Sequence, residues 1–523
     1  MDVTNLGPET PRSVHTGGRP DTATDGPIDA PADSVRTDDR AGSTAERERD
    51  IAGRQRDVTG GAADGESTAA GRSVVFVSQQ YPPDRSGHAS RVRDTATALA
   101  DEGWDVTVLA APPSFPPGAF DRRWRPLTST VEDGVTVRRL WTWQPTEPDP
   151  GFLTRLCYYV VFALFATLWI TVTHRRHDVV VTTTPPISTG LAGFPAAILG
   201  RRWVVDVRDL WIDASVSLGF IAEGGLLERG SRQFQRAALR TADSISVTTA
   251  TLGESLADQY GGRLAAKTVL VPNGVDVAEF RERVDGGTPA DAGDVSGASD
   301  EPRADGEPTD NTENEPAGDA CDDAAERFEV VYTGNIGHAQ SLDTCVRALG
   351  HLPDKVVLRL VGGGDAVPAL RSLAVERGVA DRVEFEGTVS HDRIPAILRA
   401  ADVGIAPLED NPELAYAMPT KVYEYLCVGL PVVVTGRGEL ERFVRESNSG
   451  LVADPDPESV ASAVTRLLAD PELRATLGRQ GHEHVRRTYD RAAIAARFSD
   501  HLHGLVDGRV GTPESSDRRG VVE

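Results

Sequence analysis

The sequence predicts an α/β protein made of two domains, each built around a mostly parallel sheet. Its 523 residues are enough for two domains and additional segments. Short runs of valine and other apolar residues alternate with segments of helical periodicity, a pattern typical of βαβ units. A long acidic segment at 283–326 interrupts this pattern and divides it into two blocks.

The first block, residues 72–282, has the alternation of a doubly wound domain. A polar loop at 79–87 follows its first strand, and a helix over 89–102 ends before Gly103. The predicted strands are Val74–Val77, Val106–Ala110, Val179–Thr182, Trp203–Val207, Ser244–Thr248 and Thr268–Val271. Because ligands bind at the carboxyl ends of such strands, the loops that follow them are the places to look for a site.

The second block begins at residue 327 and repeats the pattern. Its predicted strands are Glu329–Tyr332, Val356–Val361, Val383–Phe385, Val403–Ala406 and Val432–Thr435. A last helical region covers 471–503. Two doubly wound domains of this kind leave a cleft between them.

Charge is distributed unevenly along the chain. The formal net charge is -24, and residues 285–326 hold 14 acidic residues against one arginine. We predict that this insertion, 283–326, and the similarly polar ends, 1–71 and 506–523, are disordered. Three of the 55 basic residues are lysines and acid exceeds base in the folded blocks too, which suggests a halophilic source. No basic stripe suits a nucleic acid, so none is expected as a partner.

The cysteines and the N-terminus indicate a cytosolic protein. Cys157, Cys321, Cys345 and Cys427 have neither paired spacing nor a Cys-x-x-Cys metal pattern, which favours a reducing setting. The N-terminus is polar and acidic, unlike a secretory signal.

The segment MPTKVYEYLCVGLP at 418–431 is the most informative one. It predicts a short helix with Thr420 as N-cap and Gly429 after its last turn. Lys421 and Glu424 then share one face beside the unpaired N–H groups of the first turn. Such a helix end attracts phosphate, and the carboxylate can accept hydrogen bonds from ribose hydroxyls. The alternative is a surface helix with an incidental ion pair.

An uncharged apolar run, LCYYVVFALFATLWITV, predicts a helix over 156–173. Its length is at the lower limit for crossing a bilayer, but the strands before and after it belong to one predicted sheet. We therefore expect it to pack on the first domain and to present an apolar face to a membrane surface, with Arg155, Arg175 and Arg176 touching anionic headgroups. A wholly buried helix is the alternative.

The order of several motifs resembles the retaining glycosyltransferases of family 4, in which two Rossmann-like domains face each other across a donor-binding cleft (the GT-B fold). The resemblance covers residues 73–500 and is carried by QQYPPDRSGHASR, VVDVRDLW, VPNGVD, YTGNIGHAQSLDT, LVGGGDAVPAL, FEGTVSHDRIPAILRAADVGIAPL and PTKVYEYLCVGLP. It implies that 72–282 binds the acceptor and that 327–482 binds the nucleotide sugar. It also implies that a C-terminal helix, 483–505, crosses back to the first domain.

Three positions depart from the family pattern. Most relatives neutralise the diphosphate with an arginine and a lysine where this chain has Asn335 and Gln340. The GNIG and AQ found here are closest to a subgroup that resembles amino-sugar transferases of capsule and surface-polysaccharide assembly. The first of the family's two glutamates is Tyr416 in this chain, whereas Glu424 matches the second. Charge compensation would then come from Lys421, Arg208 and Arg437.

The remaining predicted site residues follow strand ends. The donor-binding set consists of Gly87, Asn335, Gly337, Gly363, Gly364, Gly387, Val389, Lys421, Glu424 and Arg437. Triple glycine at 362–364 is also an ordinary turn. His88 and Asp206 are predicted at the acceptor, although a lone loop histidine is more often incidental. Asp209 is predicted to orient or deprotonate the acceptor hydroxyl; its alternative role is to cap the next helix.

These expectations describe a glycosyltransferase, of hexosyl or N-acetylaminosugar type, that acts on a lipid-linked or glycan acceptor. Asp209, Arg208 and Lys421 are its predicted catalytic residues, and the nucleotide sugar is its donor substrate. No Asp-x-Asp motif is placed for a metal, so no obligatory cofactor is expected. The enzyme is expected in the cytoplasm, peripheral at the inner face of the cell membrane. The alternatives are a nucleotide-sugar epimerase and a non-catalytic sugar-nucleotide scaffold.

Overall fold

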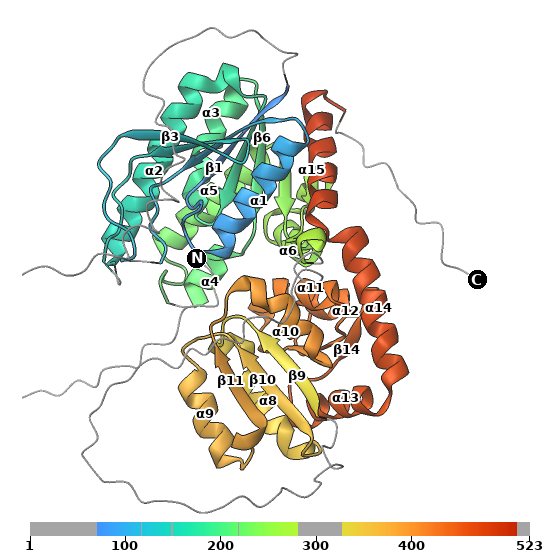
Figure 1. Ribbon diagram of the computed structural model, residues 1–523. Helices are drawn as coiled ribbons and strands as arrows, with labels where there is room; N and C mark the ends of the chain where they lie inside the picture. Colours follow the sequence, from blue (N-terminus) through green and yellow to red (C-terminus); the bar gives the residue numbers. More distant parts are fainter. Residues whose placement is uncertain (1–70, 117, 148–149, 218, 281–326, 510–523) are drawn as a thin grey trace, which may run out of the picture. The chain divides into compact units, whose positions relative to one another are not determined.

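A computed structural model describes residues 71–116, 118–147, 150–217, 219–280 and 327–509 (Figure 1). Of the segments predicted to be disordered, residues 1–70, 283–326 and 510–523 lie outside these described residues. The described chain contains two sheets, and we call the part built on each one the N-terminal and the C-terminal lobe. The predicted α/β class with two mostly parallel sheets is confirmed.

The N-terminal lobe holds an eight-stranded sheet in the order β3-β4-β2-β1-β5-β6-β7-β8. Its strands are β1 (Ser73–Ser78), β2 (Asp105–Ala110), β3 (Leu127–Glu132), β4 (Val135–Leu140), β5 (Val179–Thr184), β6 (Arg202–Val207), β7 (Ser244–Val247) and β8 (Thr268–Leu270). All neighbouring pairs are parallel except β3 and β4, which form a hairpin. The six predicted strands are present.

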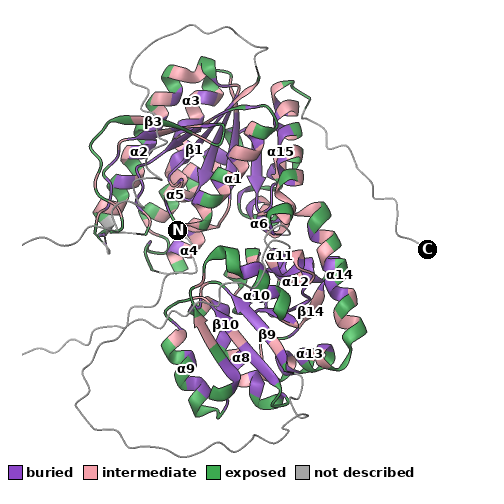
Figure 2. Cartoon of the chain, viewed as in Figure 1, coloured by how far each residue is buried: buried purple, intermediate pink, exposed green. Residues whose placement is uncertain are grey.

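Helices cover both faces of this sheet (Figure 1). They are α1 (Gly87–Asp101), α2 (Phe152–Thr173), α3 (Gly193–Ile198), α4 (Trp211–Ser217), α5 (Leu226–Thr241) and α6 (Ala250–Tyr260), with short 3-10 turns such as η4 (Ile187–Ala192). Residues of β1 alternate between the two faces: Val74 and Phe76 join one buried cluster, and Val75 and Val77 join the other. Because both faces are covered, the central strands are mostly apolar and largely buried (Figure 2).

The C-terminal lobe holds a six-stranded parallel sheet in the order β11-β10-β9-β12-β13-β14. Its strands are β9 (Phe328–Thr333), β10 (Val356–Val361), β11 (Val383–Gly387), β12 (Val403–Ala406), β13 (Val432–Val434) and β14 (Gly450–Val452). Its helices are α8 (Leu342–Ala348), α9 (Val367–Glu376), α10 (Ile394–Ala400), α11 (Thr420–Cys427), α12 (Glu439–Ser447) and α13 (Pro457–Ala469), with short turns η6 (His338–Gln340) and η9 (His391–Arg393).

The last two helices connect the lobes. α14 (Pro471–Thr488) packs on the C-terminal lobe, and α15 (Arg491–Val506) begins after Asp490, which caps it. α15 contributes Ile494, Phe498, Leu502 and Leu505 to the buried cluster that contains β1 and β2 of the N-terminal lobe. The indole N–H of Trp104 also donates to Ser499 Oγ at 2.9 Å. The crossing therefore occurs at Tyr489, and the boundary predicted at 482 falls inside α14.

Three strands were not predicted. The hairpin of β3 and β4 turns at Asp133 and Gly134, both with positive φ, which is the Asp-Gly signal of a two-residue hairpin loop. Four of the six residues of β3 are exposed, so this edge strand lacks the apolar run that identified the others. β14 has only three residues, too few for a periodic pattern.

Candidate active site

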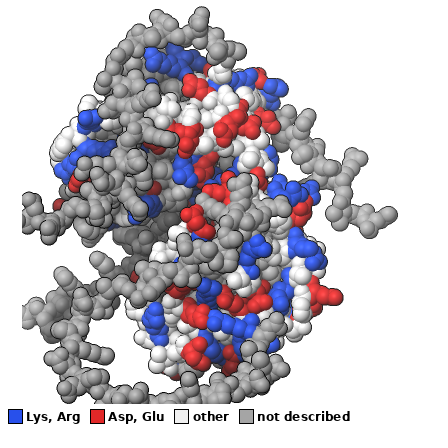
Figure 3. All heavy atoms as spheres, viewed as in Figure 1, with Lys and Arg blue, Asp and Glu red and all other residues white. Residues whose placement is uncertain are grey.

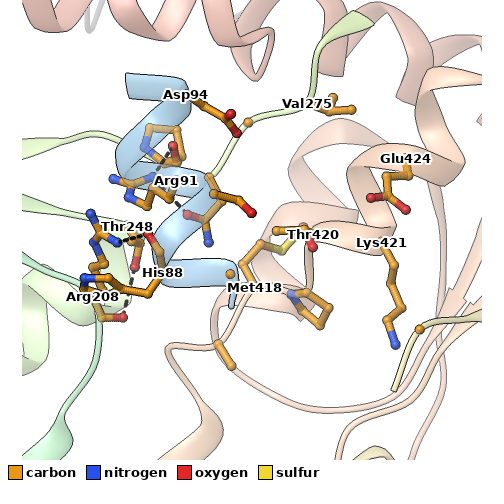
Figure 4. Close-up of a pocket in the computed structure, with 18 of the residues that line it drawn as sticks. His88, Arg91, Asp94, Arg208, Thr248, Val275, Met418, Thr420, Lys421 and Glu424 are labelled. Atoms are coloured by element: carbon orange, nitrogen blue, oxygen red, sulfur yellow. Dashed lines mark hydrogen bonds between the residues drawn. The ribbon is translucent and has the colours of Figure 1, made fainter. Parts of the chain in front are cut away.

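The carboxyl ends of strands from both sheets open on a cleft of about 860 Å³. Seven predicted site residues line it: Gly87, His88, Arg208, Asp209, Asn335, Lys421 and Glu424. Figure 4 shows His88 and Arg208 on one side of this pocket and Lys421 and Glu424 on the other. The other predicted residues lie outside the lining: Asp206, Gly337, Gly363, Gly364, Gly387, Val389 and Arg437.

The first turn of α11 forms one wall of the cleft. The helix begins at Thr420, with Pro419 in the capping position and no side-chain cap. The prediction that Thr420 caps the helix is wrong, because Thr420 is already its first helical residue. Gly429 has φ +75° and so ends the helix as predicted. Uncapped N–H groups therefore start a helix whose first residues line the cleft.

Lys421 lines the cleft and is half-buried. Its amine lies 3.6 Å from the centre of the Tyr332 ring, so an aromatic face holds it. Burial lowers the pKa of Lys421 to about 7, and Glu424 opposes this shift only in part. In Figure 4 the two side chains leave α11 in different directions. The amine is thus placed to gain a proton when an anion arrives.

Glu424 lies one turn further along α11. Burial raises the pKa of its carboxyl, and His391, Lys421 and Arg491 act in the opposite direction. His391 belongs to η9, after β11, and Arg491 begins α15. Residues from three separate elements of the chain therefore converge on this carboxylate.

The opposite wall comes from the N-terminal lobe. Ser86 Oγ accepts the N–H of Ala89 at 3.1 Å and caps α1, so that Gly87 and His88 form the first turn beside the cleft. Arg208, after β6, donates from Nη1 to the carbonyl of His88 at 3.1 Å and from Nε to Asp206 at 2.7 Å. These bonds fix the guanidinium against the start of α1.

Asp206 lies behind Arg208 and is 6% exposed. Burial alone would raise the pKa of its carboxyl, but Arg208 and Arg91 outweigh burial and hold that pKa below its usual range. Ser246 Oγ also donates to it at 2.8 Å. Asp206 was predicted at the acceptor; the structure places it beneath the cleft wall, as the anion that holds two buried arginines.

The ring of His88 is directed into the N-terminal lobe. Its Nε2 lies 3.1 Å from Ser78 Oγ and 3.3 Å from Thr183 Oγ1. Burial lowers the pKa of His88 well below its usual value, so the ring is neutral at pH 7. The predicted contact of this ring with an acceptor finds no support here, because its Nε2 is occupied by buried hydroxyls.

Asp209 makes a contact that the sequence did not reveal. The phenol of Tyr416, in the C-terminal lobe, donates a hydrogen bond to the Asp209 carboxylate in the N-terminal lobe. Beside it, Thr249 Oγ1 donates to the carbonyl of Tyr416 at 2.9 Å. Tyr416, which stands where the family has a glutamate, therefore links the lobes across the cleft.

Two models of known families match the chain. "Glycosyl transferases group 1" matches residues 327–470, and "Glycosyl transferase 4-like domain" matches residues 86–274. A D-inositol 3-phosphate glycosyltransferase of Acidothermus cellulolyticus is 30% identical over 77% of this chain and 82% of its own length. The chain belongs to the group 1 glycosyltransferases of family 4.

This glycosyltransferase is also similar to a second relative in sequence and to a solved structure in fold. A putative colanic acid biosynthesis glycosyl transferase, WcaI, of Escherichia coli is 24% identical over 82% of the chain and its own full length. The structure of Anabaena Alr3699/HepE in complex with UDP-glucose has a TM-score of 0.54 and 17% identity, and it covers 83% of this chain and 100% of the Anabaena chain. The likeness to the Anabaena structure shows the GT-B fold.

The glycine loops of the glycosyltransferase pack against one another. Gly362 donates to Gly387 O at 2.8 Å, and Ile336 donates to Gly363 O at 2.9 Å. A Cβ at Gly362 would lie 1.9 Å from Gly334 O, and one at Gly364 would lie 2.2 Å from Ile336 O. These two glycines allow the loops after β9 and β10 to approach closely. The donor-binding role predicted for Gly363, Gly364 and Gly387 stays a prediction.

The two neutral amides of the glycosyltransferase both reach the cleft. Asn335 lines it, and its carbonyl accepts the phenol of Tyr332, the ring that holds Lys421. Gln340 is 6% exposed, and its Oε1 is buried without a hydrogen-bond partner. A buried acceptor of this kind is satisfied by a donor from an ordered water molecule or from a ligand. From the sequence, Gln340 stood out only as a neutral residue where most relatives have a charged one.

Arg437 lies apart from the cleft lining and near Asp410 and Asp454, at 3.7 and 3.4 Å. Its predicted part in charge compensation is not supported by this placement. Within the described residues, no group of three or more His, Cys, Asp or Glu side chains could hold a metal ion.

Proposed function

We propose that this glycosyltransferase moves a sugar from a nucleotide-diphosphate sugar to a hydroxyl of a lipid-linked glycan, with retention of configuration. One observation carries the proposal: the uncapped start of α11, with Lys421 and Glu424, faces Arg208 and Asp209 of the other lobe across one cleft. The Lys421 amine and the free N–H groups of α11 can bind a diphosphate, and the Glu424 carboxylate can accept hydrogen bonds from ribose hydroxyls.

The reaction breaks the bond between the anomeric carbon and the diphosphate oxygen, and the acceptor oxygen forms the new bond to that carbon. Negative charge develops on the leaving diphosphate, where Lys421, Arg208 and the first N–H groups of α11 stabilise it. The acceptor hydroxyl gives its proton to the departing diphosphate oxygen, so the charges balance. Asp209, held by Tyr416, orients that hydroxyl.

Retention of configuration is inferred from the family. The type of sugar is inferred from the positions at which this chain departs from the family pattern. Gln340 offers an acceptor and Asn335 an amide where most relatives carry charges, which suits a donor with an additional polar N–H. We therefore place the enzyme among hexosyl- or N-acetylaminosugar transferases of surface-polysaccharide assembly. The name of the Escherichia coli relative, colanic acid biosynthesis, is compatible with this role.

The test is a donor panel followed by transfer. UDP-, GDP- and dTDP-sugars, including UDP-N-acetylglucosamine, are screened by thermal shift in molar KCl, and those that bind are incubated with a membrane lipid extract. We expect a glycosylated lipid whose new anomeric centre has the donor's configuration by NMR. Lys421→Ala should remove turnover while the unfolding temperature without donor falls little.

Three outcomes oppose the proposal. Isomerisation of the donor sugar without any acceptor would indicate an epimerase. Donor binding without hydrolysis or transfer would indicate a non-catalytic scaffold. Equal loss of folding and turnover in Lys421→Ala would make this lysine structural.

A further inference from the structure

Helix α2 presents two apolar faces. Tyr158, Phe162, Ala166 and Ile170 are buried on one side against β1, β2 and β5. Positions two residues away lie about 200° round the helix. On that opposite side stand Leu156, Val160, Leu164, Leu168 and Val172, which are 40% to 73% exposed. We call these five residues the apolar stripe of α2.

A surface helix of a soluble domain normally carries polar residues on its outer side. The hydroxyls of this helix do not compensate for the apolar stripe. Thr167, Thr171 and Thr173 each donate to the carbonyl four residues earlier, at 2.6 to 2.8 Å. Because these hydroxyls are satisfied within the helix, the outer side of α2 needs few water molecules.

A tryptophan cluster, formed by Trp124, Trp141 and Trp143, adjoins the stripe. Trp141 contacts Phe165 of α2 edge-on, with the ring centres 6.1 Å apart, and Trp124 contacts both other tryptophans. Trp124 is 65% exposed. Arg122 lies over the Trp143 ring at 4.6 Å. Exposed indoles beside arginine are typical of the boundary between lipid and water.

Charge around the stripe favours an anionic surface. Residues 119–177 contain eight arginines against five acidic residues, in a chain whose net charge is -24. Arg175 and Arg176 follow the end of α2 directly. Figure 3 shows basic side chains along the edge of the N-terminal lobe where β3 lies. Anionic headgroups attract such clusters.

α2 is by length and composition the one helix of the described chain that could cross a membrane. Its position in the fold opposes a crossing, because β4 before it and β5 after it belong to the same sheet and its inner side is packed on that sheet. The segments 1–70, 281–326 and 510–523 contain no Phe, Trp or Tyr.

The inner side of α2 adjoins residues that lie next to the cleft. Gln79, after β1, donates to the carbonyl of Tyr158 in α2 at 3.3 Å. A small hollow lies between Gln80, Tyr159, Pro185 and Trp211, and Pro185 also lines the cleft.

We propose that the apolar stripe of α2 and the tryptophan cluster form a docking surface for an anionic lipid bilayer, from which the acceptor enters the cleft. The stripe inserts among the acyl chains at the level of the headgroups, and the arginines contact lipid phosphates. This inference rests on the proposed function for the acceptor, but the docking itself is independent of turnover.

The experiment is flotation of the full chain with phosphatidylcholine vesicles, with and without phosphatidylglycerol, at low and molar KCl. We expect the wild type to float with the anionic vesicles. Leu164→Glu/Leu168→Glu should reduce its partition roughly tenfold or more, because two apolar side chains would be replaced by carboxylates. The matched control is Val375→Glu, on α9 of the other lobe, where the valine is 70% exposed. The control should float like the wild type.

Two results would overturn the docking surface. One is that the wild type does not float with anionic vesicles, or that the stripe variant and the control variant float to the same extent. The other is a wild-type dimer, seen by light scattering, that the stripe variant converts to a monomer, since the stripe would then join two copies of this chain. Binding of the donor panel described above is measured on the same samples. Retained donor binding shows that the stripe variant is folded, whereas a wild type that floats but binds no donor refutes only the proposed function.

Discussion

Raising the pH above 7 should weaken donor binding, because Lys421 of the donor-free protein then loses its proton. Burial lowers the pKa of this amine from 10.5 to about 7. Such a shift corresponds to about 5 kcal/mol of preference for the neutral form. Tyr332, whose ring faces the amine, has its own pKa raised by burial and so adds no charge in this range.

The direction in which Kd changes with pH depends on whether Lys421 is already protonated before the donor binds. Below pH 7 the amine is charged before the diphosphate arrives, so affinity is nearly constant. Above pH 7 each binding event must take a proton from solution, and Kd should rise about tenfold per pH unit until the pKa of the complex is reached. The slope of log Kd against pH is therefore close to +1 above neutrality.

Titration calorimetry with a donor that binds, UDP-glucose or GDP-mannose, measures this directly between pH 6 and pH 9. Two buffers of different ionisation enthalpy give the number of protons taken up, which should be about half at pH 7 and nearly one at pH 8. Lys421→Met should bind weakly and without this uptake. Lys267→Arg is the matched control, since Lys267 donates to the carbonyls of Arg240 and Ala242 instead. A flat Kd with no proton uptake in the wild type would refute the reasoning.

Three further predictions concern other residues. Tyr416→Phe should slow transfer about 10-fold to 100-fold, the value of a hydrogen bond to a charged group, while donor Kd from calorimetry stays unchanged; a weakened Kd would place Tyr416 at the donor instead. Glu424→Gln should raise donor Kd about tenfold with little loss of turnover at saturation, and an unchanged Kd would exclude a ribose contact. The Leu502 side chain is fully buried between α15 and the first sheet, so Leu502→Ala should lower the free energy of unfolding in urea by about 2 to 5 kcal/mol. Val375 is exposed, and Val375→Ala should lower it by under about 0.5 kcal/mol. Equal effects would contradict the packing of α15.

Most of the fold could be predicted from the sequence because its central strands are buried on both faces. Such strands are apolar runs, as Val432–Val434 illustrates, and they alternate with helices in a fixed order. The β3 strand breaks this rule, since it lies at an edge and four of its six residues face solvent. Its only signal was the Asp-Gly turn.

The site could be predicted where it depends on local spacing. Lys421 and Glu424 stand three residues apart near a helix start, so a single helical turn brings them to one wall. The hydrogen bond between Asp209 and Tyr416 joins residues 207 positions apart, and the buried ring of His88 depends on Ser78 and Thr183. Contacts of this kind follow from tertiary packing, which no pattern in one sequence records.

Two cations line the cleft, Arg91 and Lys421, and their surroundings differ. The difference explains why position 421 is a lysine in a chain that uses arginine almost everywhere else. Arg91 is also buried; burial lowers its pKa to about 10, so it stays charged and needs Asp206, the Pro272 carbonyl and the Asn273 amide oxygen as partners. Those partners keep the guanidinium in place and compensate its charge. At position 421 an aromatic face takes the place of such close partners, and Glu424 offsets the burial only in part, so a guanidinium would be a poorly compensated charge there. An amine can give up its proton there and recover it from solution when the diphosphate binds.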